Sequence, residues 1–273
     1  MRTAMTRRLG VVGYPIRHSI SPAMHQAALD ELGIDARYER WEVAPADLAG
    51  WVASLRDPAV LGANVTVPHK QAVMPFLDEL APAARAIGAV NTIVSLEGRL
   101  RGDNTDAAGF ARALRDVATG VTPRRAVLLG AGGAARACVH ALLERRNDVL
   151  VANRSAERLD ALLRSIEVEG RRPRSAPWPR AGERIAAGAV VNTTPLGMRG
   201  EDPLDGVGLP PLVVDIVPTA EPTALVKRAQ ATENVAVVDG LSMLLHQAAR
   251  SFELWTGAPA PLAAMRAALP RPA

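Results

Sequence analysis

The sequence predicts two α/β domains: an N-terminal mixed-sheet domain, a Rossmann-like domain after it, and C-terminal helices that return to the first domain. Three observations favour this fold. The 273 residues suffice for two domains of ordinary size. Short apolar strands alternate along the chain with segments of helical spacing. A glycine-rich turn at residues 130–135 follows a strand and precedes a helix.

The first domain is expected at residues 1–105 together with 241–273. Its sequence pattern predicts strands at 9–14, 38–43 and 60–67, and helices at 21–32, 46–55, 242–256 and 261–269. Residues 90–96 and 99–103 predict a hairpin, because Glu97-Gly98 supplies a two-residue turn. The last helices should pack back on this domain and leave a cleft between two lobes, where small ligands usually bind.

The second domain is expected at residues 106–240, with crossings at Asn104-Thr105 and Asp239-Gly240. The pattern predicts strands at 126–129, 149–152, 189–192, 212–216 and 235–238. Helices are predicted at 107–117, from the glycine turn to about 146, at 157–166 and at 224–229. The stretch 171–180, rich in proline and arginine, is expected to be a loop.

Composition excludes several classes of function. The net charge is +4, the basic residues are dispersed among 28 acids, and aromatics are 3% of the chain, whereas a nucleic-acid surface needs a concentrated basic stripe with stacking aromatics. No apolar run approaches the ~20 residues of a membrane helix, and no signal-peptide core follows the first residues, so we expect a cytoplasmic protein. One cysteine and scattered histidines predict no metal site. The expected partners are small molecules, with a homodimer as the candidate assembly.

The glycine-rich turn has the spacing of a dinucleotide-binding fingerprint. Its first glycine permits the tight turn, its second lets the backbone approach a pyrophosphate, and Ala135 allows close packing of helix and strand. The helix start offers free N–H groups to the phosphates. A turn without function is the alternative, but the strands on either side favour a cofactor. The predicted contacts are Gly130, Ala131, Gly132, Gly133 and Ala134.

The strand at 149–152 distinguishes NADP from NAD. An NAD enzyme places an acid directly after this strand, but here Asn153, Arg154 and Ser155 follow. Arg154 and Arg158 can clamp a 2′-phosphate, with Asn153 and Ser155 as neutral donors. Although arginines of an arginine-rich surface are the alternative, we predict NADP as the cofactor.

Lysine is scarce in this chain. Of 32 basic residues, only Lys70 and Lys227 are lysines. Arginine keeps its proton near neutral pH, whereas a lysine ammonium can release one where its surroundings favour it. Lys227 fits the polar face of a helix, whereas Lys70 lies in a different sequence context.

Six short stretches occur in series along the chain. They are YPIRHSISP at 14–22, NVTVPHK at 64–70, AVNT at 89–92, GDNTD at 102–106, GAGGA at 130–134 and DGLSMLLHQ at 239–247. Together they closely resemble the shikimate dehydrogenase family over nearly the whole chain. The resemblance implies NADPH-dependent, reversible reduction of 3-dehydroshikimate to shikimate, a step of aromatic amino acid biosynthesis through chorismate.

The resemblance also implies a role for individual residues. Ser19 and Ser21 would hold the substrate carboxylate, although Ser21-Pro22 also predicts a helix N-cap. The ring hydroxyls would be bound by four side chains that can donate and accept hydrogen bonds, Asn64, Thr66, Asn91 and Gln247. The alternative for each of them is a hydrogen bond to nearby backbone. Lys70 would exchange the proton with the substrate oxygen and Asp106 would orient the amine, with a surface salt bridge as the alternative. The remaining implied cofactor contacts are Thr194, Ile216, Gly240 and Met243.

Two positions depart from the family pattern. Pro218 stands where members usually carry a substrate-contacting tyrosine, and Ser242 replaces a usual glycine. A quinate/shikimate dehydrogenase of the same fold is one alternative, although the serine pair and the arginines after the strand at 149–152 favour shikimate and NADP. A non-catalytic NADP-binding sensor is another, but it would not need Lys70 with Asp106.

Overall fold

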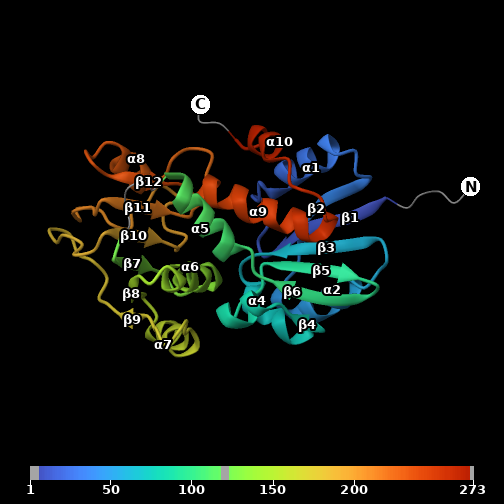
Figure 1. The fold of residues 1–273 in the computed structure, drawn as a ribbon, viewed down its shortest axis with the longest axis horizontal. Helices are drawn as coiled ribbons and strands as arrows, with labels where there is room; N and C mark the ends of the chain where they lie inside the picture. The colour runs from blue at the N-terminus through green and yellow to red at the C-terminus, as the bar shows by residue number, and fades with distance from the viewer. Residues whose placement is uncertain (1–5, 118–122, 271–273) are drawn as a thin grey trace, which may run out of the picture. The chain divides into compact units, whose positions relative to one another are not determined.

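The computed structural model describes residues 6–117 and 123–270 of the chain (Figure 1). The chain forms two compact units. One contains the described residues up to Thr105 together with Gln247–Leu269, and the other contains the described part of Asp106–His246. The second crossing between the units thus lies inside a single helix, α9 (Gly240–Thr256).

The first unit contains a six-stranded mixed sheet of order β2-β1-β3-β5-β6-β4. The strands are β1 (Arg7–Gly13), β2 (Ala36–Glu42), β3 (Val60–Val65), β4 (Glu79–Leu80), β5 (Thr92–Leu96) and β6 (Arg99–Asp103). β1 pairs parallel with β2 and β3, whereas β5 is antiparallel to both β3 and β6. The predicted mixed sheet and the hairpin closed by Glu97-Gly98 are confirmed.

Helices flank these strands in the sequence. They are α1 (Ser21–Glu31), α2 (Leu48–Ser54), α3 (His69–Ala72), α4 (Pro82–Ile87), α10 (Leu262–Ala267) and the C-terminal part of α9, with short 3-10 turns at Pro45–Asp47 and Met74–Phe76. The sequence pattern missed α3, α4 and β4. Each is too short to display a hydrophobic period, although α4 carries local signals, with proline at its start and Gly88 at φ +70° after its end.

The second unit contains a parallel sheet of order β12-β11-β10-β7-β8-β9, which can be followed in Figure 1. The strands are β7 (Arg125–Leu129), β8 (Asp148–Ala152), β9 (Arg174–Ser175), β10 (Ala189–Asn192), β11 (Leu212–Asp215) and β12 (Ala236–Val238). Read from β9, the strands come in the order 3-2-1-4-5-6 along the chain, which is the Rossmann arrangement. Ligands of such sheets bind at the carboxyl ends of the strands, where the order reverses between β7 and β10.

The helices of this unit lie before, between and after these strands in the sequence. They are α5 (Asp106–Val117), α6 (Gly133–Glu144), α7 (Ala156–Ser165), α8 (Ala224–Gln230) and the start of α9. The expectation that 171–180 is entirely loop is wrong, because β9 lies within it and pairs with β8. A two-residue strand at the edge of a sheet is too short to show a periodic pattern, and the prolines around it are typical of a loop.

The indole of Trp255 on α9 packs against β3 with no room to spare. Its Nε1 donates to the carbonyl oxygen of Ile93 at 2.8 Å. A Cβ atom on Gly62 would lie 2.1 Å from that same oxygen and 2.5 Å from the indole nitrogen. Glycine at 62 therefore allows the C-terminal part of α9 to lie against the sheet.

We expect Gly62→Ala to lower the free energy of unfolding by about 2–3 kcal/mol, because the added methyl group must displace backbone or indole. Urea denaturation measures the effect. Gly50→Ala is the matched control, since a Cβ there meets no atom within 4 Å. It should be neutral or stabilise by up to about 1 kcal/mol. Equal effects of both substitutions would contradict this account of the packing.

Candidate functional site

Asn64 lies at the centre of a buried polar network in the first unit. The register of the sheet places it opposite Thr92. Its Nδ2 group donates to Thr92 Oγ1 at 3.3 Å and to Ser251 Oγ at 3.0 Å, while its Oδ1 accepts from the Tyr38 hydroxyl at 2.6 Å. Both polar atoms of this amide are thus engaged within the protein.

Asn91 joins the same network from the residue before β5. Its Oδ1 accepts from the backbone N–H of Thr105 at 2.7 Å. Its Nδ2 donates to Thr105 Oγ1 at 2.9 Å and to Gln247 Oε1 at 3.2 Å. Three of the amides expected from the sequence, on segments far apart in the chain, are therefore brought together.

Three hydroxyl groups that the sequence analysis did not single out connect these amides. Ser251 Oγ lies 2.7 Å from Thr92 Oγ1 and 3.0 Å from Thr105 Oγ1. Ser251 also donates to the carbonyl oxygen of Gln247, one helical turn earlier on α9. The four-residue spacing from Gln247 is the signal that could have identified Ser251.

The backbone of Lys70 is hydrogen-bonded to the residue that precedes Asn91. Its carbonyl oxygen accepts from the N–H of Val90 at 2.7 Å, and Val90 directly precedes Asn91. α3 begins directly after the segment that holds Thr66, whose carbonyl accepts from the N–H of His69 at 2.9 Å. Lys70 is half-buried. Asp106, which is buried, is the first residue of α5 in the second unit.

The two serines expected at the substrate carboxylate lie at the start of α1. The predicted N-cap at Ser21 is wrong, because Ile20 is the N-cap residue and Ser21 already belongs to the helix. Instead, Ser19 Oγ accepts from the N–H of Ser21 at 3.4 Å. Arg40 on β2 donates twice to the Ser19 carbonyl, at 2.7 and 3.0 Å. Both serines are therefore tied to one short segment.

The glycine turn of the second unit has the shape that a pyrophosphate requires. Gly130 has φ +112°, and a Cβ on it would lie 2.5 Å from Thr193 Oγ1 and 3.2 Å from Thr194 Cγ2. In contrast, a Cβ on Gly132 would meet no atom within 4 Å. Gly132 is the N-cap of α6, and no side chain caps the first N–H groups of this helix. The residues present thus fit the phosphates of a dinucleotide.

The segment after β8 carries two exposed arginines, Arg154 and Arg158. Ser155 is the N-cap of α7 and accepts from the N–H of Arg158 at 3.3 Å. Asn153 donates to the carbonyl of Ser155 at 2.8 Å. These bonds shape the turn that carries the two guanidinium groups, a donor set suited to a phosphate on the adenosine ribose.

The other expected cofactor contacts lie at the same carboxyl edge of the sheet. Thr194 adjoins Gly130, as described above. A Cβ on Gly240 would lie 2.3 Å from the carbonyl oxygen of Val217 and 2.7 Å from the carbonyl carbon of Ile216. The start of α9 therefore lies directly against the loop that follows β11. Met243, one turn further along α9, is buried.

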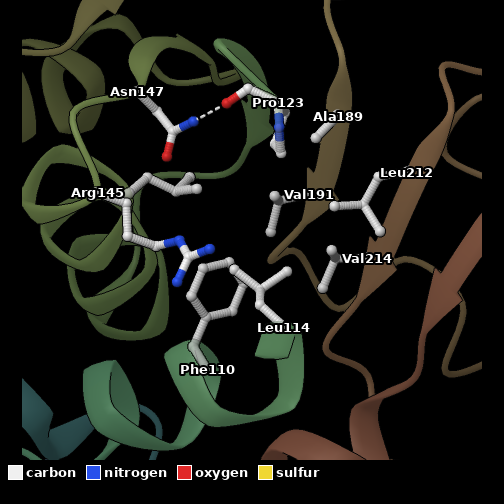
Figure 2. Close-up of a pocket in the computed structure, with 10 residues that line it drawn as sticks. Phe110, Leu114, Pro123, Arg145, Asn147, Ala189, Val191, Leu212 and Val214 are labelled. Carbon is white, nitrogen blue, oxygen red and sulfur yellow. Dashed lines mark hydrogen bonds between the residues drawn. The ribbon is translucent and has the colours of Figure 1, made fainter. Parts of the chain in front are cut away.

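The second unit also contains a small apolar pocket, which lies away from the glycine turn. Figure 2 shows that it is flanked by Arg145 and Asn147 and that its lining includes Ala189 and Leu212. Ala189 and Leu212 are the first residues of β10 and β11. The pocket is thus at the amino ends of these strands, opposite the edge that carries the glycine turn.

Within residues 6–117 and 123–270, no group of three or more His, Cys, Asp or Glu side chains could hold a metal. None of the helices formed by these residues has the length and apolar character that crossing a bilayer requires.

The Rossmann strand order, the glycine turn and the separate mixed-sheet unit define a two-domain α/β protein with a dinucleotide-binding fold. Residues 11–93 match the model of the shikimate dehydrogenase substrate binding domain, and residues 240–269 match that of the shikimate 5′-dehydrogenase C-terminal domain. A relative from Symbiobacterium thermophilum named shikimate dehydrogenase (NADP(+)) is 42% identical, over 96% of this chain and 93% of the relative. The chain therefore belongs to the shikimate dehydrogenase family.

Solved structures agree with this assignment. Shikimate 5-dehydrogenase from Thermus thermophilus, in complex with NADP(H) and shikimate, has a TM-score of 0.82 at 37% identity, covering 96% of this chain and 98% of that one. Quinate dehydrogenase from Corynebacterium glutamicum, in complex with NAD, has a TM-score of 0.86 at 31% identity, covering 96% and 98%. The predicted fold class is confirmed.

The buried ring of His25 is expected to make stability depend on pH. His25 on α1 stacks on Tyr38 with ring centroids 4.3 Å apart, and burial lowers the pKa of His25 from 6.5 to about 3. Between these values the unfolded chain binds a proton that the folded chain does not. The contribution of the neutral, buried His25 to the free energy of unfolding is therefore fully present above pH 6.5 and is lost as the pH falls toward 3.

Wild-type protein should lose about 2 kcal/mol more stability between pH 7 and pH 5 than His25→Phe, which lacks the titrating ring. Urea denaturation at both pH values measures the difference. His18→Gln, which removes an exposed histidine, should behave like the wild type. The same loss of stability in His25→Phe as in the wild type would show that His25 is not responsible.

Proposed function

We propose that this chain catalyses the reversible, NADPH-dependent reduction of 3-dehydroshikimate to shikimate. The observation that carries the proposal is the buried amide network of Asn64, Asn91 and Gln247, joined through Val90 to the backbone of Lys70. A polyol needs groups that donate and accept, and carbonyl reduction needs an acid beside them. The names of the relatives and the complexes of the solved neighbours support the same reaction.

Lys70 is proposed as the residue that moves the proton. Bound nicotinamide supplies a hydride to the carbonyl carbon. The carbonyl oxygen, which gains negative charge, takes a proton from the Lys70 ammonium and becomes the hydroxyl. In the reverse direction the neutral amine takes this proton back. Arginine could not do so near neutral pH, which is the chemical reason for lysine here.

Asp106 is proposed to orient the amine and to accept a hydrogen bond from the same substrate hydroxyl. It would act from the start of α5, in the unit that binds the cofactor. The proposed domains are residues 1–105 with 241–273 for the substrate and residues 106–240 for NADP, whereas the compact units divide within α9, between His246 and Gln247.

The remaining polar residues of the first unit are proposed to hold the substrate. Ser19 and Ser21 would donate to the carboxylate, while Thr66, Asn91 and Gln247 would bind the ring hydroxyls. A substrate oxygen at Asn64 would take the place of one of the present acceptors of its Nδ2 group, because both hydrogens of that group are already donated within the protein. Binding of this kind replaces bonds within the network by bonds to the ligand.

The second unit is proposed to hold NADPH. The phosphates would lie at the start of α6, on Gly130, Ala131, Gly132, Gly133 and Ala134. Arg154 and Arg158 would clamp the 2′-phosphate on the turn shaped by Asn153 and Ser155. The nicotinamide end would lie among Thr194, Ile216, Gly240 and Met243.

Oxidation of shikimate and of quinate, each with NADP+ and with NAD+, tests this function. Formation of the reduced cofactor is followed by its absorbance, and shikimate with NADP+ should give the highest kcat/KM. Quinate with NAD+ is the informative comparison, because a structural neighbour is a quinate dehydrogenase in complex with NAD. Preference for quinate, or no turnover with any pair, would overturn the proposal.

Lys70→Ala and Lys70→Arg should each lower kcat roughly 10³-fold, because neither side chain can supply and regain the proton. The Kd of NADPH, measured by fluorescence titration, should change by less than about twofold. Lys227→Arg, at the exposed lysine of α8, is the matched control and should retain wild-type kcat. Full activity of Lys70→Arg would remove lysine from the mechanism.

Replacing both Arg154 and Arg158 by serine should raise KM for NADPH about 10- to 100-fold, because two charge-assisted contacts to one phosphate are lost. KM for NADH, which lacks that phosphate, should stay near its wild-type value. Arg112→Ser, at an exposed arginine of α5, controls for the change of charge. A parallel rise for both cofactors would place the 2′-phosphate elsewhere.

A further inference from the structure

Asp215, the last residue of β11, is a fully buried carboxylate at the carboxyl edge of the parallel sheet. Three groups donate to it. Asn192 Nδ2 and the N–H of Val217 donate to Oδ1 at 2.9 and 3.2 Å, and Thr223 Oγ1 donates to Oδ2 at 2.6 Å. The donors come from the end of β10, the loop after β11 and the N-cap of α8.

The bonds of Asp215 extend to the residues proposed for the cofactor. Asn192 presents its Oδ1 to both the N–H and the hydroxyl of Thr194, at 3.1 and 2.7 Å. Thr194 in turn lies against Gly130. On the other side, Val217 is held at its N–H by Asp215, while its carbonyl oxygen lies against Gly240. The carboxylate thus connects the loop after β10 to the loop after β11.

Burial makes this carboxylate expensive to keep. It raises the pKa of Asp215 above its ordinary value, although the bonds from Thr223, Val217 and Asn192 oppose that rise. A well-packed apolar side chain often serves stability as well as a buried charge does. What an apolar side chain cannot do is fix three donors from separate segments in one geometry.

We propose that Asp215 is a positioning residue of the cofactor site, which holds the loops after β10 and β11 in the arrangement that accepts NADPH. The inference rests on the proposed function and adds a residue that would touch neither substrate nor cofactor. Its effect should therefore appear in cofactor affinity and leave substrate affinity unchanged.

The experiment is calorimetric titration of Asp215→Asn with NADP+ and, separately, with shikimate. The substituted amide can accept on one side, but it leaves one of the buried donors unmatched, so the loops shift. The Kd of NADP+ should rise about tenfold, as for loss of an outer-shell partner, and the Kd of shikimate should change by less than about twofold.

Asp148→Asn is the control. Asp148 is a carboxylate of the same unit at the opposite, amino edge of the sheet, where Arg125 and Arg174 each donate to it at 2.7 Å. The substitution should lower the melting temperature and leave the Kd of NADP+ within about twofold of the wild type. Loss of NADP+ affinity in Asp148→Asn as large as in Asp215→Asn would mean that general destabilisation explains both.

Wild-type affinity for NADP+ in folded Asp215→Asn, or equal weakening of both ligands, would overturn the inference. Should Asp215→Asn fail to fold, Thr223→Val removes one of the three bonds, leaves the carboxylate in place and is judged by the same ratio of Kd values. Failure of the proposed function looks different, since the wild-type protein itself would then bind no NADP+ or leave shikimate unoxidised.

Discussion

Buried side chains that can donate and accept hydrogen bonds must find partners, and this requirement organises the first unit around Asn91. Its amide connects the chain before β5, the residue before α5 and the first residue of α9 that belongs to this unit. An unmatched polar group at such depth would cost about 1–3 kcal/mol, so each segment restricts where the others can lie. In the proposed function the same groups would bind the hydroxyls of a polyol. The cluster of buried donors and acceptors that such a substrate needs would therefore also stabilise the fold.

In the second unit the main constraint is the close approach of backbone segments at the carboxyl edge of the parallel sheet. Gly130 and Gly240 allow neighbouring segments to come within distances that a Cβ atom would forbid. Gly132 leaves space that no protein atom fills. Gly130 and Gly240 thus allow close backbone packing, whereas Gly132 leaves room beside the turn. The N-terminus of α6, which no side chain caps, favours an anionic group.

Much of this arrangement could be predicted from the sequence, because the relevant signals are local. The turn at Glu97-Gly98, the strands of the parallel sheet and the glycine fingerprint each depend on a few adjacent residues. The cap of α1 was not predicted correctly from Ser21-Pro22, because Ile20 has helical backbone angles and Ser21 is already the first residue of the helix. β9 and α3 are too short to show a period. Ser251 and Asp215 escaped notice because their partners are assigned by sheet register and by packing between distant segments.

The positions of the two lysines in the structure add to what their scarcity in the sequence indicates. Both stand in a chain where arginine supplies nearly all the positive charge. Lys227 is exposed on α8, where either side chain would be solvated equally well. Lys70 is half-buried, and its own carbonyl is bonded to the segment that carries Asn91. A guanidinium there could bind a ligand more strongly but could not return a proton to it. The role proposed for Lys70 therefore requires proton exchange, which an amine can provide and a guanidinium cannot.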